Sequence, residues 1–248
     1  MIKGLYTAAS GMMLNMAKQD VIANNIANVN STGYKKDQTV TKAFPQMLIS
    51  RLNEKGSPKV IGSLGTGACV SGIYTDYSKG NLKRTDNEYD LAIDGEGFFV
   101  VALPGGEEGF TRSGNFKLNQ EGILVNNQGY PVLDYNDDLI YIEQENFTID
   151  ERGIISIDGE EITRLKIVVF DDLGQLIKKG DNIYTSSAGY TEDDASRILQ
   201  GYLEESNVNA VKEMIDLITA VRSYESLQKV VQAEDEAIKT AVNQVGSV

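Results

Sequence analysis

The side chains of this sequence that could carry chemistry are mainly carboxylates, because it holds 36 Asp and Glu residues and no histidine. Asp134, Asn136, Asp138 and Glu145 match positions 1, 3, 5 and 12 of a calcium-binding loop. The match fails at position 6, where Leu139 replaces the glycine that the sharp turn of such a loop requires. An acidic, solvent-exposed turn accounts for these residues more simply than a calcium site does.

The residue types exclude most other reaction chemistries. Without histidine there can be no Ser-His-Asp or Cys-His nucleophile and no His-ligated zinc. Cys69 is the single cysteine, which excludes an intramolecular disulfide and a thiolate metal cluster. The glycine-rich stretch 62–67 lacks the lysine of a phosphate-binding loop, and no spacing singles out a pair of carboxylates for glycoside hydrolysis. We therefore expect no catalytic residue, no cofactor and no bound metal.

Length and charge limit the fold and the partners. The 248 residues allow one large or two small domains, and 41% apolar residues are enough for a core. The net charge of −13 argues against nucleic acid and anionic lipid, which both need clustered Lys and Arg. No run reaches the roughly 20 apolar residues that a membrane span needs, so we expect no membrane insertion. The start of the chain also lacks the continuous apolar segment of a cleaved secretory signal.

The elements that would position a site differ between the ends and the middle of the chain. All four prolines and 20 of the 24 glycines lie between residues 33 and 189. Residues 1–36 carry a net charge of +3 and residues 204–248 carry −4, so most of the negative charge lies between them. Opposite charges suit the two ends to lie near one another, although exposed attractions of this kind are weak.

The N-terminal segment predicts an amphipathic helix. Apolar, small or amide side chains recur with heptad spacing at Ile2, Leu5, Ala9, Met12, Met16, Gln19, Ala23 and Ile26. Asn15, Lys18 and Asp20 flank this stripe with polar groups. Because Asn and Ser compete for backbone hydrogen bonds and Gly33 can take a positive φ, the helix should end between Asn28 and Gly33.

The C-terminal segment predicts a second, longer helix. No glycine or proline interrupts residues 207–245, a length of about 55 to 60 Å as a helix. Its stripe comprises Met214, Leu217, Val221, Tyr224, Gln228, Val231, Asp235, Ile238, Val242 and Val245. Ser206 or Asn207 is the expected N-cap, with Glu204 and Glu205 placed favourably for the helix dipole.

A heptad helix at each end suggests that the ends pair, since each alone would expose its stripe to water. Two interpretations remain open: an intramolecular coiled coil, or a polymer whose subunits bury the rest of each stripe against neighbours. In the second case the assembly seam comprises Ile2, Leu5, Met12, Met16, Ile26, Met214, Leu217, Val221, Tyr224, Val231, Ile238 and Val242.

The middle of the chain predicts an antiparallel β domain. From Ile73 onward, short apolar runs such as 98–101 and 165–170 alternate with turn signals such as Asp94-Gly95, without intervening helices. Around residues 44–52 we expect a short helix or an extended arm. The predicted class is α+β, with an N-terminal helix at 1–32, a linker or arm at 33–72, a β domain at 73–200 and a C-terminal helix at 201–248.

Three stretches, in order along the chain, resemble the flagellar axial proteins of bacteria, specifically the basal-body rod proteins and their hook relatives. The first is 20–29 with Thr32-Gly33-Tyr34-Lys35; the second comprises 80–82, 90–99 and 110–116; the third is 200–209. The motif residues taken to carry the resemblance are Asn24, Asn25, Asn28, Gly33, Tyr34, Gly95, Gly97, Phe98, Ser206 and Asn207.

The resemblance implies a structural subunit of the rod, the drive shaft that transmits torque toward the hook. It implies terminal helices that line a hollow axial tube and a β domain that forms an outer layer. It also implies export through the flagellar type III apparatus to the basal body, with other copies and other rod or hook axial proteins as partners. Proximal and distal positions both stay open. The alternatives are a β-domain adhesin or carbohydrate-binding surface protein, and an enzyme that uses carboxylates.

Overall fold

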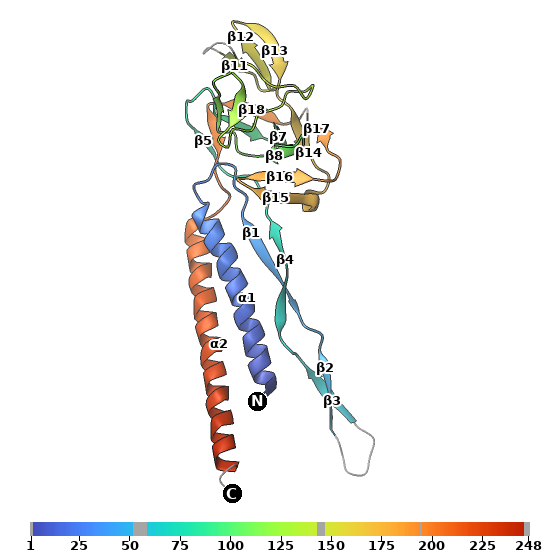
Figure 1. The fold of residues 1–248 in the computed structure, drawn as a ribbon, viewed down its shortest axis with the longest axis vertical. Coiled ribbons are helices and arrows are strands. Elements are labelled where there is room, and N and C mark those ends of the chain that lie inside the picture. Colours follow the sequence, from blue (N-terminus) through green and yellow to red (C-terminus); the bar gives the residue numbers. More distant parts are fainter. Residues whose placement is uncertain (1, 52–58, 143–146, 194, 246–248) are drawn as a thin grey trace. The chain divides into compact units, whose positions relative to one another are not determined.

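The structure is a computed structural model that describes residues 2–51, 59–142, 147–193 and 195–245. The chain divides into two compact units. Unit 1 comprises residues 1–27, 37–74 and 209–248, and unit 2 comprises 28–36 and 75–208. Helices occupy the two ends and antiparallel strands dominate the middle, which confirms the α+β class (Figure 1).

Unit 1 contains two helices, α1 (Ile2–Ala27) and α2 (Ala210–Val245), which run antiparallel side by side (Figure 1). Near one end, Asn25 Nδ2 donates to Glu213 Oε2 at 3.3 Å. Further along, a Cβ on Gly11 would lie 2.8 Å from Leu227 Cδ1, and one on Gly4 would lie 2.6 Å from Glu234 Oε1. Equal numbers of residues separate these contacts on both helices, so the register is constant along the pair.

Small side chains on α1 allow this close approach. Gly4, Ala8 and Gly11 face α2, and Ala8 is buried. On α2 the least exposed positions form a regular 3,4 series, Glu213, Leu217, Ala220, Tyr224, Leu227, Val231, Glu234, Ile238 and Ala241. This series shares four positions with the expected stripe. At its other positions, the least exposed residue is the one directly before a residue of the expected stripe. The helices meet along the face of α1 where the side chains are small, and this shifts the buried side of α2.

Both helix ends are close to their expected places. Helix α1 ends at Ala27, and a turn follows over residues 28–33. The expected N-cap of α2 is wrong: the helix starts at Ala210, and Asn209 Oδ1 accepts from Lys212 N at 3.1 Å. Asn209 rather than Ser206 or Asn207 therefore satisfies a free amide of the first turn.

Unit 1 also contains an arm, whose described residues 37–51 and 59–74 are built mainly from strands. β1 (Asp37–Ala43) pairs with β4 (Ala68–Thr75), and β2 (Met47–Arg51) pairs with β3 (Lys59–Leu64). Of the two expectations for residues 44–52, the extended arm is correct for the described part, whereas Leu52 lies outside it. Pro45 cannot continue a helix, and the Thr and Val residues of β1 favour strands.

Unit 2 is built on a six-stranded antiparallel sheet in the described part of the chain, ordered β15-β16-β8-β7-β14-β17. Its strands are β7 (Phe98–Ala102), β8 (Glu108–Thr111), β14 (Ile167–Val169), β15 (Leu176–Gly180), β16 (Ile183–Ser186) and β17 (Thr191–Glu192).

Smaller sheets complete unit 2 as the pairs β5-β19, β6-β18 and β9-β10 and the triplet β11-β12-β13. Their bounds are β5 (Leu82–Arg84), β6 (Leu91–Asp94), β9 (Phe116–Leu118), β10 (Leu124–Asn126), β11 (Phe147–Ile149), β12 (Ile154–Ile157), β13 (Glu160–Arg164), β18 (Arg197–Gln200) and β19 (Tyr202–Glu204). A short 3-10 helix, η1, spans Leu173–Gln175.

Strand β7 lies at the centre of the core. Phe98, Phe99, Val100 and Val101 are all fully buried. Because side chains alternate along a strand, Phe99 and Val101 pack in one apolar cluster, and Phe98 and Val100 pack in a second cluster on the other face. This explains why the apolar run is continuous rather than alternating.

One turn geometry recurs four times among the residues of unit 2 that the structure describes, at Asn119, Asn126, Asp134 and Asp150. In each turn the side-chain Oδ1 accepts from the amides two and four residues later, at 2.7 to 3.1 Å. The fourth residue of each turn has a positive φ: Gly122, Gly129, Asp137 and Gly153. The shared pattern is Asn or Asp, two residues, then Gly or Asp.

This geometry corrects the expectation of a solvent-exposed turn at Asp134 alone, because residues 135–139 of the calcium-like stretch are exposed as expected and Glu145 lies outside the described residues. Asp134 is buried rather than solvent-exposed, and its second oxygen accepts from the Thr163 hydroxyl at 2.7 Å. Its carboxylate is therefore used to organise the turn. In the described residues, no three Cys, Asp or Glu side chains gather as a metal site would need.

Candidate assembly site

The first and last segments of unit 2 lie side by side and form what we call the terminal junction, residues 28–36 and 204–208. Gly33 N donates to Glu204 O at 2.8 Å, and Asn207 N donates to Tyr34 O at 3.4 Å. The Asn207 side chain adds further bonds: its Oδ1 accepts from Lys36 N at 2.9 Å, and its Nδ2 donates to Asp76 O at 2.8 Å and to Ser78 Oγ at 3.1 Å. The segments that lead to the two helices are thus held together.

A buried ion pair lies at the centre of the terminal junction. Lys35 Nζ is 2.6 Å from Glu204 Oε1, and 0% and 2% of the two side chains are exposed. Lys35 Nζ also donates to Ser78 O at 2.7 Å, and Glu204 Oε1 accepts from Gly80 N at 2.8 Å. Burial lowers the pKa of Lys35 below its usual range, and the neighbouring Glu204 carboxylate only partly offsets this.

Arg112 is the third buried charge of this cluster. Its Nη1 lies 3.6 Å from Glu204 Oε2 and donates to Gly95 O at 3.0 Å. Its guanidinium carbon lies 4.8 Å from the centroid of the Phe98 ring, a cation–π arrangement. Burial also lowers the pKa of Arg112, against the raising effect of Glu204. Two cations thus share one carboxylate at a site shielded from solvent.

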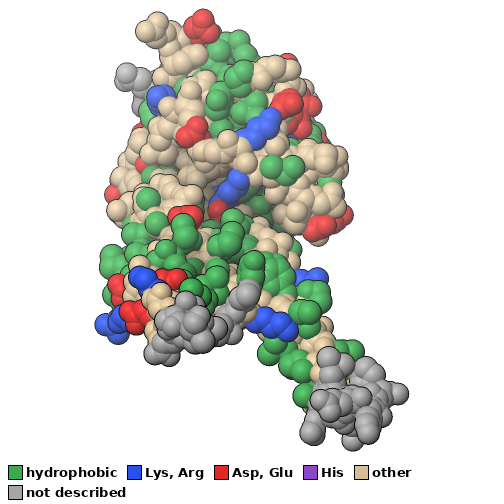
Figure 2. Space-filling view, turned by 60° about the horizontal axis from the view of Figure 1, so that its bottom comes forward, with side chains coloured by type: hydrophobic (Ala, Val, Ile, Leu, Met, Phe, Trp, Pro, Cys, Tyr) green, Lys and Arg blue, Asp and Glu red, His purple; other side chains and the backbone are tan. Residues whose placement is uncertain are grey.

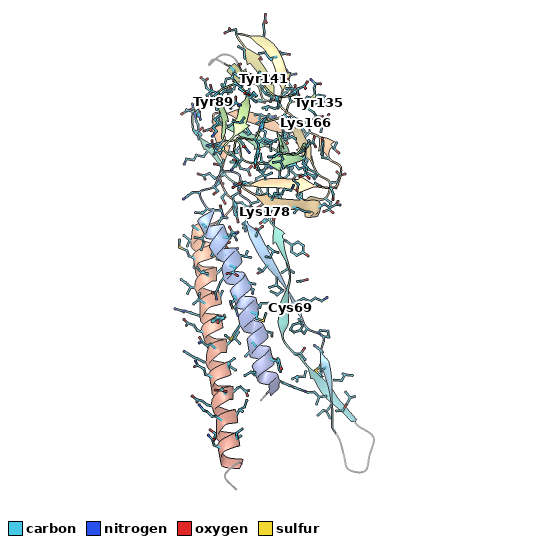
Figure 3. The ribbon with its side chains drawn as sticks, viewed as in Figure 1. Cys69, Tyr89, Tyr135, Tyr141, Lys166 and Lys178 are labelled. Atoms are coloured by element: carbon cyan, nitrogen blue, oxygen red, sulfur yellow. The ribbon has the colours of Figure 1, made fainter. Side chains whose placement is uncertain are left out.

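The motif residues Gly33 and Tyr34 shape the surroundings of this cluster. Gly33 has φ +65°, and a Cβ there would lie 2.4 Å from the backbone carbon of Arg112, so only glycine fits. Tyr34 is buried, and Lys178 Nζ lies 4.7 Å from the centroid of its ring. The same Lys178 amine, labelled in Figure 3, donates to Lys35 O at 2.8 Å.

Asn25 connects three elements of unit 1. Its side-chain Oδ1 accepts from Asp37 N and its Nδ2 donates to Asp37 O, both at 2.9 Å. The same amide group reaches Glu213 on α2. A buried carboxamide can satisfy both the backbone N–H and the backbone C=O of one residue in this way, which an ionised carboxylate cannot do because it only accepts. Neighbouring Asn24 is exposed.

The remaining motif residues lie at close approaches or turns in unit 2. A Cβ on Gly95 would lie 1.7 Å from Ser196 Oγ, and one on Gly97 would lie 2.3 Å from Ile167 Cγ2. Asn28 Oδ1 accepts from Ser31 Oγ at 3.1 Å. Ser206 Oγ accepts from Val208 N at 3.3 Å. Their roles are local: the two glycines allow close approaches to Ser196 and Ile167, and Asn28 and Ser206 stabilise turns within the terminal junction.

The residues of the predicted assembly seam divide into two groups within unit 1. Met16, Met214, Val221 and Val242 are exposed to solvent. The partly buried members are Leu5, Met12, Ile26, Leu217, Tyr224, Val231 and Ile238. Ile2 belongs to α1, but its side chain lies outside the described residues. Their role in assembly stays a prediction.

Further apolar side chains are exposed along the helices and the arm. On the helices they include Tyr6, Met13, Val211, Ile215 and Ile218. On the arm they include Val40, Met47, Leu48, Val60, Ile61, Ile73 and Tyr74, and Figure 2 shows hydrophobic atoms along it. Cys69 lies on β4 of the arm and is half-buried (Figure 3). Exposed apolar surface of this extent is typical of an interaction surface.

Sequence reasoning missed the cluster of Lys35, Arg112 and Glu204 as a site. It assigned Glu204 to the dipole of the C-terminal helix, whereas the structure buries it against the two cations. A signal existed, since each of the three charges falls within one of the three stretches that carry the family resemblance.

In the described part of the chain, no helix is long and apolar enough to span a membrane. Both long helices carry charged side chains along their lengths.

Three family models match the chain in the order in which the stretches occur. Residues 5–35 match the model described as flagella basal body rod protein. Residues 92–157 match the flagellar hook protein FlgE/F/G D1 domain. Residues 199–244 match the flagellar basal body rod FlgEFG protein C-terminal. The first match covers residues 28–35 of the terminal junction, the third covers residues 204–208, and Arg112 lies in the second.

Curated relatives align over nearly the whole chain. The flagellar basal-body rod protein FlgF of Caulobacter vibrioides is 36% identical over 253 residues, covering 100% of both chains. The flagellar basal-body rod protein FlgG of Borreliella burgdorferi is 33% identical over 267 residues, covering 98% of each. The flagellar hook-basal body complex protein FlhO of Bacillus subtilis is 32% identical over 272 residues, covering 100% of both.

Proposed function

This chain belongs to the flagellar basal-body rod protein family, and from that premise we propose that it self-assembles through its terminal helices into the hollow axial shaft that transmits torque toward the hook. The family is structural and belongs to the flagellar basal body. Membership also implies assembly with other rod and hook axial proteins.

The observation that carries the proposal is the apolar surface of unit 1. The described part of the chain leaves Met13 and Met16 on α1, and Met214 and Ile218 on α2, exposed to water. Full burial of one such side chain is worth about 1.5 to 3 kcal/mol. Neighbouring copies that cover these faces would therefore supply a large driving force for polymerisation, and the intramolecular pair would be completed as part of a larger coiled-coil-like layer.

Charge supports an arrangement with the helices inside. Unit 1 holds 10 basic and 9 acidic side chains, whereas unit 2 holds 13 basic and 27 acidic ones. Because unit 1 is nearly neutral, packing many copies of it into a tube causes little repulsion between like charges. Acidic β domains on the outside can keep their charges in solvent. In this proposal, residues 1–32 and 201–248 form the axial layer and residues 73–200 the outer layer.

The rest of the proposal follows from the family. The protein leaves the cytosol through the flagellar type III export apparatus, and it acts without catalysis, cofactor or metal. The alternative of an adhesin or carbohydrate-binding protein gains no support from the comparisons, whose matches name hook and rod proteins.

Incorporation into basal bodies tests the proposal. Leu217→Asp and Ile26→Asp place a charge within unit 1, and each should abolish incorporation while unit 2 stays folded. Immunoblots of purified basal bodies measure incorporation, and the position of the labelled wild-type chain distinguishes a proximal from a distal site. Normal incorporation of both variants would contradict assembly through the helices.

A further inference from the structure

A cavity in unit 2 opens beside Arg112. It has a volume of about 440 Å³ and is lined by residues 75–79, Glu96, Phe98, Arg112 and Leu173. The Arg112 side chain is only 3% exposed, yet it forms part of the cavity wall. A buried guanidinium at a cavity is unusual because its charge needs partners on several sides.

The hydrogen-bonding capacity of Arg112 is largely unused. A guanidinium carries five N–H donors. Within the described residues its one hydrogen bond runs from Nη1 to Gly95 O at 3.0 Å, and the same Nη1 forms an ion pair with Glu204 Oε2 at 3.6 Å, too long for a hydrogen bond. In the same residues, Nε has no hydrogen-bond partner, although it is buried. Glu204 does not neutralise Arg112 alone, because it also forms the 2.6 Å pair with Lys35.

The cavity wall also fixes the orientation of the guanidinium. The Phe98 ring covers one of its faces at 4.8 Å, and Gly95 O holds one edge. A planar, fixed guanidinium matches a carboxylate, which can accept two parallel N–H bonds. Lys79 contributes a second cation to the lining, although it also pairs with Asp94 at 3.3 Å.

From this geometry we propose that the cavity is a carboxylate-binding site in which Arg112 is the anchoring residue. The ligand is a small carboxylate group, either free or carried by an acidic side chain of a second copy. The inference concerns the folded chain by itself and does not depend on assembly. Two carboxylates that also line the cavity, Glu96 and Asp76, oppose an anionic ligand and weaken its binding.

Titration of the full-length chain with acetate tests the proposal. The side-chain Nε–H resonance of Arg112, assigned by its loss in Arg112→Lys, should shift in a saturable manner at constant ionic strength. Leu173→Trp fills the cavity and should weaken acetate binding by about tenfold or more, the equivalent of about 1.4 kcal/mol. Glu96→Gln should instead tighten binding. Arg197→Lys, at an exposed arginine, should change nothing.

A resonance that does not move, or that moves equally with chloride, would overturn the proposal and leave a cavity that holds only water. Opposite effects of Leu173→Trp and Glu96→Gln cannot arise from misfolding alone. The polymerisation rate of the Leu173→Trp variant distinguishes the two sources of the carboxylate, a free molecule and a side chain of a second copy. Slower polymerisation, together with inhibition of the wild type by acetate, assigns the site to a side chain of a second copy. Unchanged polymerisation with lost acetate binding assigns it to free carboxylates.

Discussion

Lys35 Nζ lies 2.6 Å from Glu204 Oε1 in the interior of unit 2, although the two residues are 169 positions apart in the sequence. Lys35 follows the N-terminal helix segment closely, and Glu204 precedes the C-terminal one. The ion pair therefore joins the two chain segments that connect the β domain to the helices. It also places a lysine where desolvation opposes its charge.

Breaking this pair should strongly destabilise unit 2. Lys35→Met leaves Glu204 with Arg112 alone, and we expect a loss of about 3 to 5 kcal/mol, typical of a broken buried pair. The matched control is Lys83→Met, since Lys83 and Glu205 form an exposed pair at 3.9 Å and should contribute less than about 1 kcal/mol. Hydrogen exchange of the β7 amides measures unit 2 separately. Similar losses for both variants would contradict the assigned role.

Gly33→Ala should destabilise unit 2 more than Gly159→Ala does, although both glycines have a positive φ. Both Gly33 and Gly159 have positive φ, which costs an alanine about 1 to 2 kcal/mol. A Cβ at Gly33 would also meet the Arg112 backbone at 2.4 Å, whereas at Gly159 nothing lies within 4 Å. Thermal unfolding of the two variants isolates the effect of the clash. Equal melting temperatures would show that the terminal junction adapts.

Two neighbouring positions on α2 should separate folding from assembly. Ala220 is buried within the helix pair, and Val221 is exposed. Ala220→Asp should therefore loosen the pair already in the monomer, measured as faster hydrogen exchange along α1. Val221→Asp should leave the monomer unchanged and impair polymerisation, measured by sedimentation. A monomer equally disturbed by both substitutions would show that the register of the pair differs from the one described.

Asn126 should contribute more to stability than its exposed neighbour Asn127. Asn126 is buried, and its Oδ1 accepts from Gln128 N at 3.1 Å and from Tyr130 N at 2.8 Å. Asn126→Ala leaves these amides without that acceptor, at a cost of about 1 to 3 kcal/mol for an unsatisfied buried group. Asn127→Ala should stay within about 0.5 kcal/mol. Denaturant unfolding of both variants decides the comparison.

Unit 2 should lose stability in acid partly through Asp193. Burial raises the pKa of the Asp193 carboxyl. Hydrogen bonds from the Ser196 hydroxyl and from the Ala195 and Ser196 amides lower this pKa by more, so it lies below the ordinary 3.8. Its contribution is therefore present above the ordinary pKa and disappears as the pH falls through the lowered one. Asp193→Asn should make the free energy of unfolding less dependent on pH below about 5. An unchanged slope would exclude this contribution.

Local patterns in the sequence were sufficient to predict the helices and strands, but not to predict which residues contact one another. The end of α1 before Gly33 follows from glycine and asparagine chemistry, and the buried run at Phe98 follows from composition. The N-cap of α2 was placed wrongly because Ser206, Asn207 and Asn209 are all good caps, and only the path of the chain selects among them. Asp134 was expected in solvent because the partner of its second oxygen, Thr163, lies 29 positions away in the sequence.

By itself, the sequence determined that helical segments with heptad spacing flank an acidic β-rich segment along the chain, and that the chain lacks the histidines and paired cysteines of many enzyme and metal sites. Tertiary structure decided which side of each helix meets the other. Apolar spacing predicts a wide stripe, but close packing selects the narrow face at Gly4 and Gly11. It also decided that Lys35, Arg112 and Glu204 share one buried site. Charges so distant in sequence acquire partners only when folding excludes water between them.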